Sequence, residues 1–387
     1  MYKILTLNKI SENGLKKFPE TYTYSSEEAN PDAILVRSAS MHEMEFDANT
    51  KAIARAGAGV NNIPLDRCSE KGMVVFNTPG ANANAVKELV LCAMLMSSRK
   101  IVSALDWVKT LKGNGAEVSK MVEKGKSAFA GPEIKGKKLG VIGLGAIGVL
   151  VANAADALGM EVYGYDPYLS VDAAWSLSRT IHHAASQDEI FKNCDYITLH
   201  VPLTPDTKEV ICKKNIDMMK DNVRIMNFAR GDLVKNEDLL EALNNSKVAA
   251  YATDFASDEL IGAPGVIILP HLGASTPESE DNCAVMAVAE IRDFLENGNI
   301  THSVNMPDVA VPRTGRTRIT IIHKNVPNVI SKITTTVADE NINIDNMVNK
   351  SRGEYAYTML DTDADVSEEA IAAITQLEET VKVRVIK

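Results

Sequence analysis

Three glycines spaced as Gly-x-Gly-x-x-Gly form the part of the sequence best suited to bind a dinucleotide. They are Gly143, Gly145 and Gly148, and they directly follow an apolar run over 138–142. The first glycine permits a tight turn, the second lets backbone approach a pyrophosphate, and the third lets a helix pack closely on its strand. The N-terminus of that helix would then hold the phosphate charge.

An acidic residue stands where the ribose of such a dinucleotide would lie. The run 160–165 predicts a second strand after the helix, and Asp166 ends it. A carboxylate at this point accepts hydrogen bonds from ribose hydroxyls and repels a 2′-phosphate, and 167–169 supply no basic residue in its place. The pattern therefore predicts NAD rather than NADP. An ordinary glycine loop between a strand and a helix is the structural alternative.

Length and charge narrow the class of protein. A chain of 387 residues exceeds a single core, so two or three domains are expected. The net charge of -10 argues against a general binder of nucleic acid or of anionic membranes. Residues 1–7 resemble a first strand rather than a signal peptide, and no apolar run is long enough to span a bilayer. We expect a cytoplasmic protein.

The cysteines give no sign of a metal site or of disulfides. Their number is odd, they are widely scattered and none forms a Cys-x-x-Cys pair. Reduced thiols are therefore expected, and no bound metal. The positions are Cys68, Cys92, Cys194, Cys212 and Cys283.

Alternating strand and helix patterns must position these residues. They fill 1–80 and again 100–280, which predicts two doubly wound, Rossmann-like parallel sheets. Open sheets of this kind bind ligands outside the carboxyl ends of their strands. Helical patterns over 85–99 and 278–297 would connect the two domains. From 318 onward the order strand, helix, strand, strand, helix, strand predicts a ferredoxin-like α+β domain.

Several separated motifs together resemble the D-isomer-specific 2-hydroxyacid dehydrogenases, and in particular the members with a C-terminal ACT domain. The resemblance covers nearly the whole chain, and the order and spacing of its motifs are more specific than any one of them. The motifs lie at 36–38, 56–63, 77–82, 143–148, 227–231, 253–255 and 270–276.

The resemblance implies a domain organisation and an activity. A split substrate domain would comprise 1–90 and 280–302, an NAD-binding domain 91–279, a linker 303–317 and an ACT domain 318–387. The active site would lie in the cleft between the first two domains, where closure excludes water. The implied reaction is the NAD-dependent oxidation of 3-phospho-D-glycerate to 3-phosphohydroxypyruvate.

The resemblance also assigns catalytic roles. His271, just after an apolar strand, would be the base, and Arg230 would bind the substrate carboxylate through its planar guanidinium group. Glu259, five positions after Asp254, would hydrogen-bond to the histidine and favour the imidazolium. The segment from Glu259 to the histidine is short for the family, and Asp258 is an alternative partner.

Contacts to cofactor and substrate follow from the same resemblance. Several of them would be made by backbone atoms alone. The substrate contacts are Arg37, Ala58, Gly59, Val60 and Asn82, with Arg37 as the phosphate ligand. The cofactor contacts are Thr78, Gly143, Gly145, Ala146, Ile147, Gly148, Asp166, Val201, Pro202, Phe228, Ala229, Asp254, Gly273 and Ala274.

The C-terminal domain resembles a small-molecule sensor. His323, Asn325 and Asn343 match the residues that bind L-serine in serine-inhibited relatives, which makes L-serine the expected effector. Asn328 stands where the family usually has glycine, so close backbone approach is in question. The alternative is that this domain only mediates assembly. Paired ACT domains imply an oligomer, a homodimer or a homotetramer.

Two other functions fit the sequence. One is a hydroxypyruvate or glyoxylate reductase, or another D-2-hydroxyacid dehydrogenase, with an ACT domain, and dependence on the substrate phosphate separates it from the first. The other is an NAD-sensing regulator, because corepressors of this fold keep the same constellation. Negligible turnover with NADH-dependent partner binding would identify it. The sequence leaves open the oligomer number and the favoured direction of the reaction.

Overall fold

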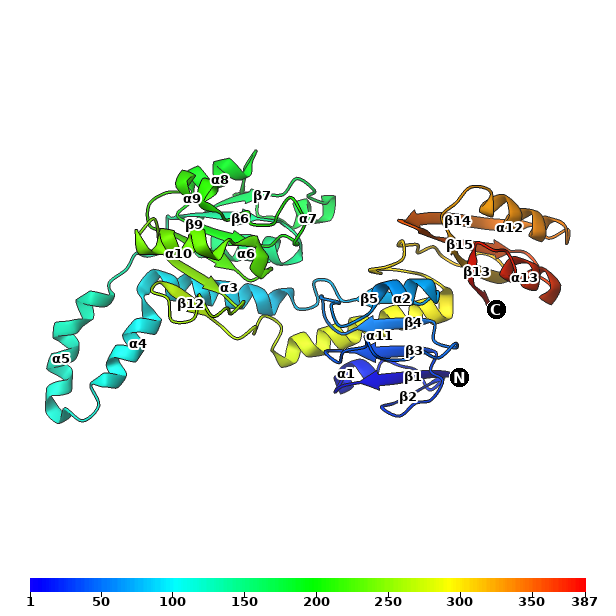
Figure 1. The fold of residues 1–387 in the computed structure, drawn as a ribbon, viewed down its shortest axis with the longest axis horizontal. Helices are drawn as coiled ribbons and strands as arrows, with labels where there is room; N and C mark the ends of the chain where they lie inside the picture. The colour runs from blue at the N-terminus through cyan, green and yellow to red at the C-terminus, as the bar shows by residue number, and fades with distance from the viewer. The chain divides into compact units, whose positions relative to one another are not determined.

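The computed structural model describes residues 1–387, which divide into two compact units. The first unit comprises Met1–Asn82 and Thr276–Lys387, and the second comprises Ala83–Ser275. The first therefore contains both ends of the chain (Figure 1). The finer domain boundaries inferred from the sequence stay predictions.

A parallel five-stranded sheet with the order β2-β1-β3-β4-β5 forms the N-terminal part of the first unit. The strands β3, β4 and β5 are short and almost wholly apolar, as is typical of strands covered on both faces. The long helix α11 packs on one face and closes a core with Phe76 and Phe294. The elements are β1 (Tyr2–Leu7), α1 (Glu12–Leu15), β2 (Tyr22–Ser25), β3 (Ala33–Val36), β4 (Ala52–Arg55), α2 (Leu65–Glu70), β5 (Val74–Asn77) and α11 (Pro277–Asn297).

A parallel seven-stranded sheet forms the second unit, with the order β12-β11-β10-β9-β6-β7-β8. Its strands are β6 (Lys138–Ile142), β7 (Glu161–Tyr165), β8 (His182–His183), β9 (Tyr196–Leu199), β10 (Val223–Asn227), β11 (Val248–Thr253) and β12 (Val266–Ile268). The order reverses beside β6, so the glycine loop that follows β6 lies at a topological switch point.

Helices cover both faces of this sheet (Figure 1). One core contains α3 (Ala83–Arg99) and α6 (Ala146–Ala157), and the other contains α8 (Gln187–Asn193), α9 (Lys213–Met218) and α10 (Asn236–Asn244). The predicted doubly wound architecture is thus confirmed. The remaining elements are α4 (Ile101–Thr110), η1 (Gly115–Glu117), α5 (Val118–Gly125), η2 (Lys126–Phe129), α7 (Val171–Ser176) and η3 (Gly231–Leu233).

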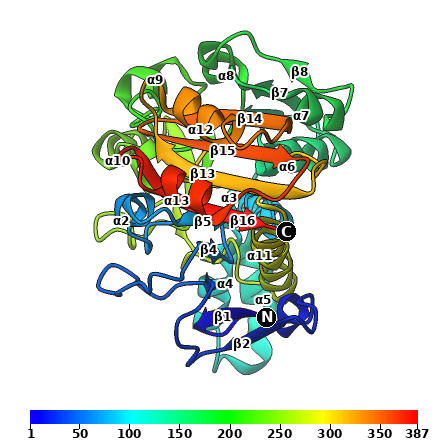
Figure 2. The same ribbon diagram turned by 90° about the vertical axis from the view of Figure 1, so that its right-hand side faces the viewer.

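The C-terminal part of the first unit is an antiparallel sheet with the order β14-β15-β13-β16 (Figure 2). The predicted ferredoxin-like order of elements is confirmed. The elements are β13 (Thr317–Lys324), α12 (Val329–Ala338), β14 (Ile344–Arg352), β15 (Tyr355–Thr362), α13 (Glu368–Thr375) and β16 (Thr380–Ile386).

The two faces of this small sheet are used differently. Ile319, Ile321 and Leu360 face the helices α12 and α13 and form their own core. Tyr357 and Met359 instead join the core that contains Phe76 and Phe294. The C-terminal domain is therefore a layer packed on the rest of the first unit.

Candidate active site

The glycine loop of the second unit has the shape that a bound dinucleotide requires. Gly143 has a φ of +93°, and a Cβ atom there would lie 2.5 Å from the carbonyl oxygen of His200. A Cβ at Gly148 would lie 1.9 Å from the carbonyl oxygen of Gly143, whereas a Cβ at Gly145 would meet nothing within 4 Å. The first and third glycines are therefore required by the fold, and the second borders open space at the start of α6. This arrangement fits a pyrophosphate.

Asp166 is held at the side of the same loop. One carboxylate oxygen accepts a hydrogen bond from the Leu144 amide at 2.8 Å, and the other accepts one from the Tyr168 amide at 2.8 Å. The side chain is half-buried, so its remaining lone pairs are accessible. The carboxylate is therefore oriented before any ligand binds, as a ribose-binding acid should be.

Residues that follow β9 pack against this loop. The side chain of Val201 lies 2.9 Å from the position of a Cβ on Gly143, and Pro202 follows it. His200, which the sequence reasoning missed, has a buried Nδ1 atom without a partner, and its Nε2 lies 2.9 Å from Oγ1 of Thr198. Burial lowers the pKa of His200 to about 3, so this imidazole is neutral. Its place at a strand end beside the glycine loop was the available signal.

His271 and Asp254 form a polar pair at the carboxyl ends of β12 and β11. His271 Nδ1 lies 3.7 Å from Oδ2 of Asp254, and the two side chains are 74% and 3% exposed. The other Asp254 oxygen is buried with no partner. Burial raises the pKa of Asp254, and the nearby His271 opposes this shift. His271 has a φ of +41°, which is uncommon for histidine. The residue lies in a tight turn, and its imidazole is exposed.

Arg230 follows the neighbouring strand β10. The buried Asn227 side chain donates to the Arg230 carbonyl at 2.9 Å, which fixes the turn, and the exposed guanidinium donates to the Ala229 carbonyl at 2.6 Å. Gly231 lies against Phe255, whose ring meets the His271 ring edge-on at 5.4 Å. Because β10, β11 and β12 are adjacent parallel strands, the structure brings Arg230, Asp254 and His271 to one edge.

The other predicted cofactor contacts of this unit lie at the same edge. Phe228 is buried and Ala229 is half-buried directly after β10. Gly273 is buried, and its Cβ position lies 3.6 Å from Oδ2 of Asp254. Ala274 follows it and is half-buried.

Glu259 is not hydrogen-bonded or ion-paired to His271. It is exposed and lines a pocket of about 350 Å³ together with Lys208, Asp232 and Lys235. Asp258 is exposed as well. The carboxylate beside the imidazole is Asp254. The predicted role of Glu259 stays a prediction.

The predicted substrate contacts of the first unit gather at the carboxyl edge of its own sheet. Arg37 follows β3 and pairs with Glu280 at 2.7 Å, with both side chains about two-fifths exposed, at 38% and 43%. Arg55 ends β4, donates to the Arg37 carbonyl at 2.9 Å and also to the Gly59 carbonyl. The sequence reasoning missed Arg55, although it stands directly before the motif that contains Ala58.

Three further predicted contacts lie in this unit, namely Thr78 for the cofactor, and Val60 and Asn82 for the substrate. Thr78 follows β5, and its Oγ1 atom is buried without a hydrogen-bond partner. Its amide donates to the Gly57 carbonyl at 3.2 Å. Val60 and Asn82 are half-buried in the same unit.

The predicted effector residues of the C-terminal domain are already engaged within the protein. His323 is buried, with Nδ1 2.8 Å from the Lys324 carbonyl and Nε2 2.9 Å from Oγ1 of Thr358. Asn325 is exposed and donates to the Gly353 carbonyl at 3.2 Å, and the exposed Asn343 donates to Asp345 at 3.1 Å.

Asn328 adopts the left-handed backbone conformation that a glycine would adopt at this position. Its φ is +70°, in the left-handed region that asparagine tolerates better than most residues. The substitution therefore leaves the loop free to adopt the turn that a glycine would allow.

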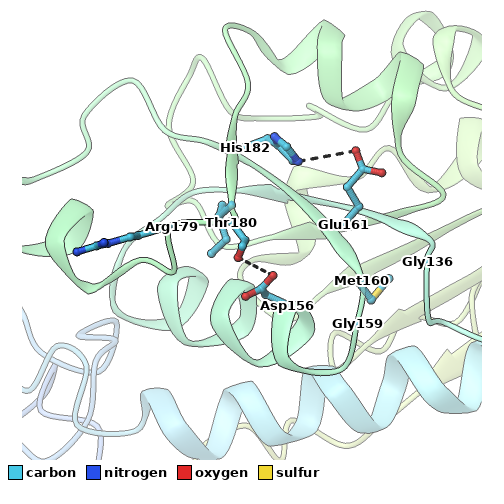
Figure 3. A pocket seen from close by; sticks show the side chains of 9 residues that line it. Gly136, Asp156, Gly159, Met160, Glu161, Arg179, Thr180 and His182 are labelled. Carbon is cyan, nitrogen blue, oxygen red and sulfur yellow. Dashed lines mark hydrogen bonds and ion pairs between the residues drawn. The ribbon is translucent and has the colours of Figure 1, made fainter.

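A larger cavity lies elsewhere in the second unit. It has a volume of about 480 Å³ and is lined by Asp156, Glu161 and Arg179 among others (Figure 3). Thr180 donates to Asp156 at 2.8 Å, and His182 lies 3.8 Å from Glu161. Because Glu161 begins β7, this cavity is at the amino edge of the sheet, opposite to the glycine loop.

No cluster of histidine, cysteine or acidic side chains could hold a metal ion. None of the helices combines the length and the apolar character that crossing a membrane requires.

A doubly wound domain with an open glycine loop, an oriented acid beside that loop, and a histidine and an arginine at one edge has the arrangement expected of a dinucleotide-binding domain. Residues 91–273 match the D-isomer specific 2-hydroxyacid dehydrogenase, NAD binding domain, and residues 317–379 match the ACT domain. The chain belongs to the D-isomer specific 2-hydroxyacid dehydrogenase family, and this part of it is the family's NAD-binding domain.

Named relatives agree with this placement. D-3-phosphoglycerate dehydrogenase of Methanocaldococcus jannaschii is 35% identical over 82% of this chain and 62% of its own length. The Bacillus subtilis enzyme of that name is 34% identical over 79% of this chain and 59% of its own length, so the chain spans about three fifths of these two relatives. The Haemophilus influenzae enzyme is 30% identical over 85% of this chain and 79% of its own length.

A solved structure has the same fold. NAD+-bound 3-phosphoglycerate dehydrogenase of Entamoeba histolytica superposes with a TM-score of 0.60 at 27% identity. The match covers 79% of this chain and 98% of that one.

Proposed function

We propose that this protein catalyses the NAD-dependent oxidation of 3-phospho-D-glycerate to 3-phosphohydroxypyruvate, the first step of L-serine biosynthesis. The observation that carries the proposal is the pair of arginines at the carboxyl edge of the first sheet, Arg37 and Arg55, in a chain whose relatives are D-3-phosphoglycerate dehydrogenases. A substrate with a phosphate and a carboxylate needs more positive charge than an unphosphorylated hydroxyacid does.

The residues at the edge of the second sheet supply the groups for the chemistry. NAD+, when bound, accepts the hydride that leaves C2 of the substrate. His271 takes the proton of the C2 hydroxyl group, for which its exposed imidazole is suited. Arg230 holds the substrate carboxylate. Asp254, at 3.7 Å from the imidazole, orients His271 and balances its charge after proton transfer, with Glu259 as the alternative partner.

The first unit would hold the two ends of the substrate. The amides of 58–60 would bind the carboxylate. Arg37 would leave Glu280 for the phosphate, because an exposed ion pair is worth only about 1 kcal/mol or less and a phosphate dianion competes well for the guanidinium.

Assembly and regulation belong to the same proposal. The helix α4 buries none of its residues and exposes Leu105 and Val108, and Met121 of α5 is exposed too. We propose that this apolar surface is covered by a second copy of the chain, in a homodimer or a homotetramer. L-serine is the proposed effector of the ACT domain, and the cytoplasm is the proposed location.

The initial rate of NADH consumption tests the proposal. We expect 3-phosphohydroxypyruvate to react far faster than hydroxypyruvate at equal concentration, because only the first has a phosphate for Arg37 to bind. Replacing Arg37 with alanine should reduce this preference and leave the rate with hydroxypyruvate unchanged. Equal or reversed preference would assign the protein to reductases of unphosphorylated acids. No rate with either substrate would favour an NAD-sensing regulator.

A further inference from the structure

A carboxyl group is buried in the middle of α11, outside the residues discussed so far. Glu290 is only 5% exposed. Its Oε1 lies 2.9 Å from Nδ1 of His302, and its Oε2 is buried with no partner. Burial, together with nearby Asp308, raises the pKa of Glu290 to about 9. Near neutral pH the carboxyl group is therefore protonated and can donate to the imidazole of His302.

Burying this carboxyl group carries a cost that depends on pH. A carboxyl group whose folded pKa is raised from 4.5 to about 9 weakens the fold as the pH rises through that range. An apolar side chain of similar size would avoid this cost. The compensating feature of the site is its link to a neighbouring loop.

His302 begins a short segment that lies along β5. The amide of Val304 donates to the Val75 carbonyl at 2.9 Å, and Ser303 pairs in antiparallel fashion with Phe76. The φ of His302 is +59°, which turns its carbonyl toward the end of the strand, where it accepts the Asn77 amide at 3.3 Å. The bond to Glu290 fixes the side chain of this turn residue.

Asn77 connects this segment to the loop 57–60, whose amides are proposed to bind the substrate carboxylate. Its Nδ2 donates to the Ala58 carbonyl at 2.5 Å, and the amide of the next residue, Thr78, donates to Gly57. The loop held in this way contains the amides of 58–60. A continuous series of contacts therefore runs from a buried carboxyl group to the loop proposed to bind the substrate carboxylate.

We propose that Glu290 and His302 are positioning residues, which hold the loop 57–60 through the His302 carbonyl and Asn77. The inference rests on the proposed function for the identity of the substrate, but the contacts themselves do not depend on it. The groups that face Glu290 are His302 and Asp308. Neither positioning residue touches the substrate.

Three variants of the full-length protein test the proposal. His302→Asn keeps a residue that tolerates positive φ but removes the imidazole, and Glu290→Leu removes the carboxyl group. Both should raise KM for 3-phosphohydroxypyruvate about fivefold, as expected for one lost hydrogen bond, with kcat changed less than about twofold. Glu290→Gln, whose amide can still donate to Nδ1, should restore a normal KM. The matched control His183→Asn changes an exposed histidine of the second unit and should have no effect.

Amide hydrogen exchange gives a readout besides activity. Exchange at 57–61 should accelerate in His302→Asn and Glu290→Leu, while exchange at 143–148 and the affinity for NADH stay unchanged. Normal KM and normal exchange at 57–61 in a folded His302→Asn variant would overturn the proposal. So would a uniform loss of protection throughout the first unit, which indicates a purely structural role. If the unmodified protein turns over neither substrate, the proposed function fails, and the exchange at 57–61 still decides whether the pair positions the loop.

Discussion

Two regions differ in how their polar groups are satisfied. One is the carboxyl edge of the second sheet, with Gly145, His200 and Asp254, here called the cofactor edge. The other is the set of predicted effector residues of the ACT domain, His323, Asn325 and Asn343, here called the effector loop. At the cofactor edge, the Asp254 Oδ1 and His200 Nδ1 atoms are buried without partners, and the space beside Gly145 is open. In the effector loop, both nitrogens of His323 are hydrogen-bonded, and Asn325 donates to the Gly353 carbonyl, although Oγ1 of Thr380, the residue that pairs with His323 across the sheet, is buried without a partner. Buried polar groups without partners are costly, and a ligand that supplies the missing contacts would remove that cost.

The named effector side chains are hydrogen-bonded within the protein, whereas the cofactor edge has buried polar atoms that lack partners. At the unpartnered atoms of the cofactor edge, a ligand can be accepted without breaking an internal contact. The effector loop offers the exposed Asn325 and Asn343, while His323 would have to give up a bond within the sheet to reach a ligand. An effector would therefore meet a loop whose histidine supports the fold.

The largest effect is expected at the cofactor edge, from loss of the Arg230 guanidinium group. Arg230→Ala should lower kcat/KM by about 10³-fold, because the substrate carboxylate loses a charged, bidentate partner. NADH affinity, measured by fluorescence titration, should stay nearly unchanged. Arg179→Ala removes an exposed arginine at the opposite edge of the sheet and is the matched control. Loss of NADH binding in Arg230→Ala would show that the arginine serves the cofactor instead.

Two carboxylates compete for the role beside His271, and their loss should differ. Asp254→Asn should reduce kcat by about 10²-fold, because the group 3.7 Å from the imidazole no longer balances its charge. Glu259→Gln should change kcat less than about threefold, since that side chain is exposed and outside the contact. Stopped-flow rates of NADH oxidation distinguish the two. The reverse order of effects would restore Glu259 to the role expected from the sequence.

Much of the fold followed from the sequence because its determinants are local. The glycines at 143, 145 and 148 act through their own backbone, and strand runs such as 138–142 are defined by composition and length. The same holds for Asp166, whose position after a strand is a matter of spacing. The predicted fold, NAD-binding domain and ACT domain are confirmed, and the contacts assigned to the three glycines and Asp166 stay predictions.

The contacts of the site were less predictable because they depend on distant segments. The family resemblance indicated Glu259, whose role stays a prediction, whereas the acid that lies 3.7 Å from His271 is Asp254, because of how β11 and β12 pair in register. Arg37 meets Glu280, and Glu290 meets His302, across turns whose geometry no local pattern encodes. Residues such as Arg55 and His200 carried a usable signal, namely their place at strand ends beside a motif.

The smallest effects are expected in the effector loop, where the comparison can be sharpened by two variants. His323→Ala should lower the free energy of unfolding by about 1–3 kcal/mol, because Thr358 loses a buried partner. Asn325→Ala should change it by less than about 0.5 kcal/mol, since its side chain is exposed. Chemical denaturation measures both. If L-serine inhibits the protein through this loop, Asn325→Ala should relieve the inhibition without loss of stability, whereas His323→Ala should relieve it together with stability. Unchanged inhibition in both variants would place the effector elsewhere, and an absent serine response in the unmodified protein would leave this loop with a role in folding and assembly only.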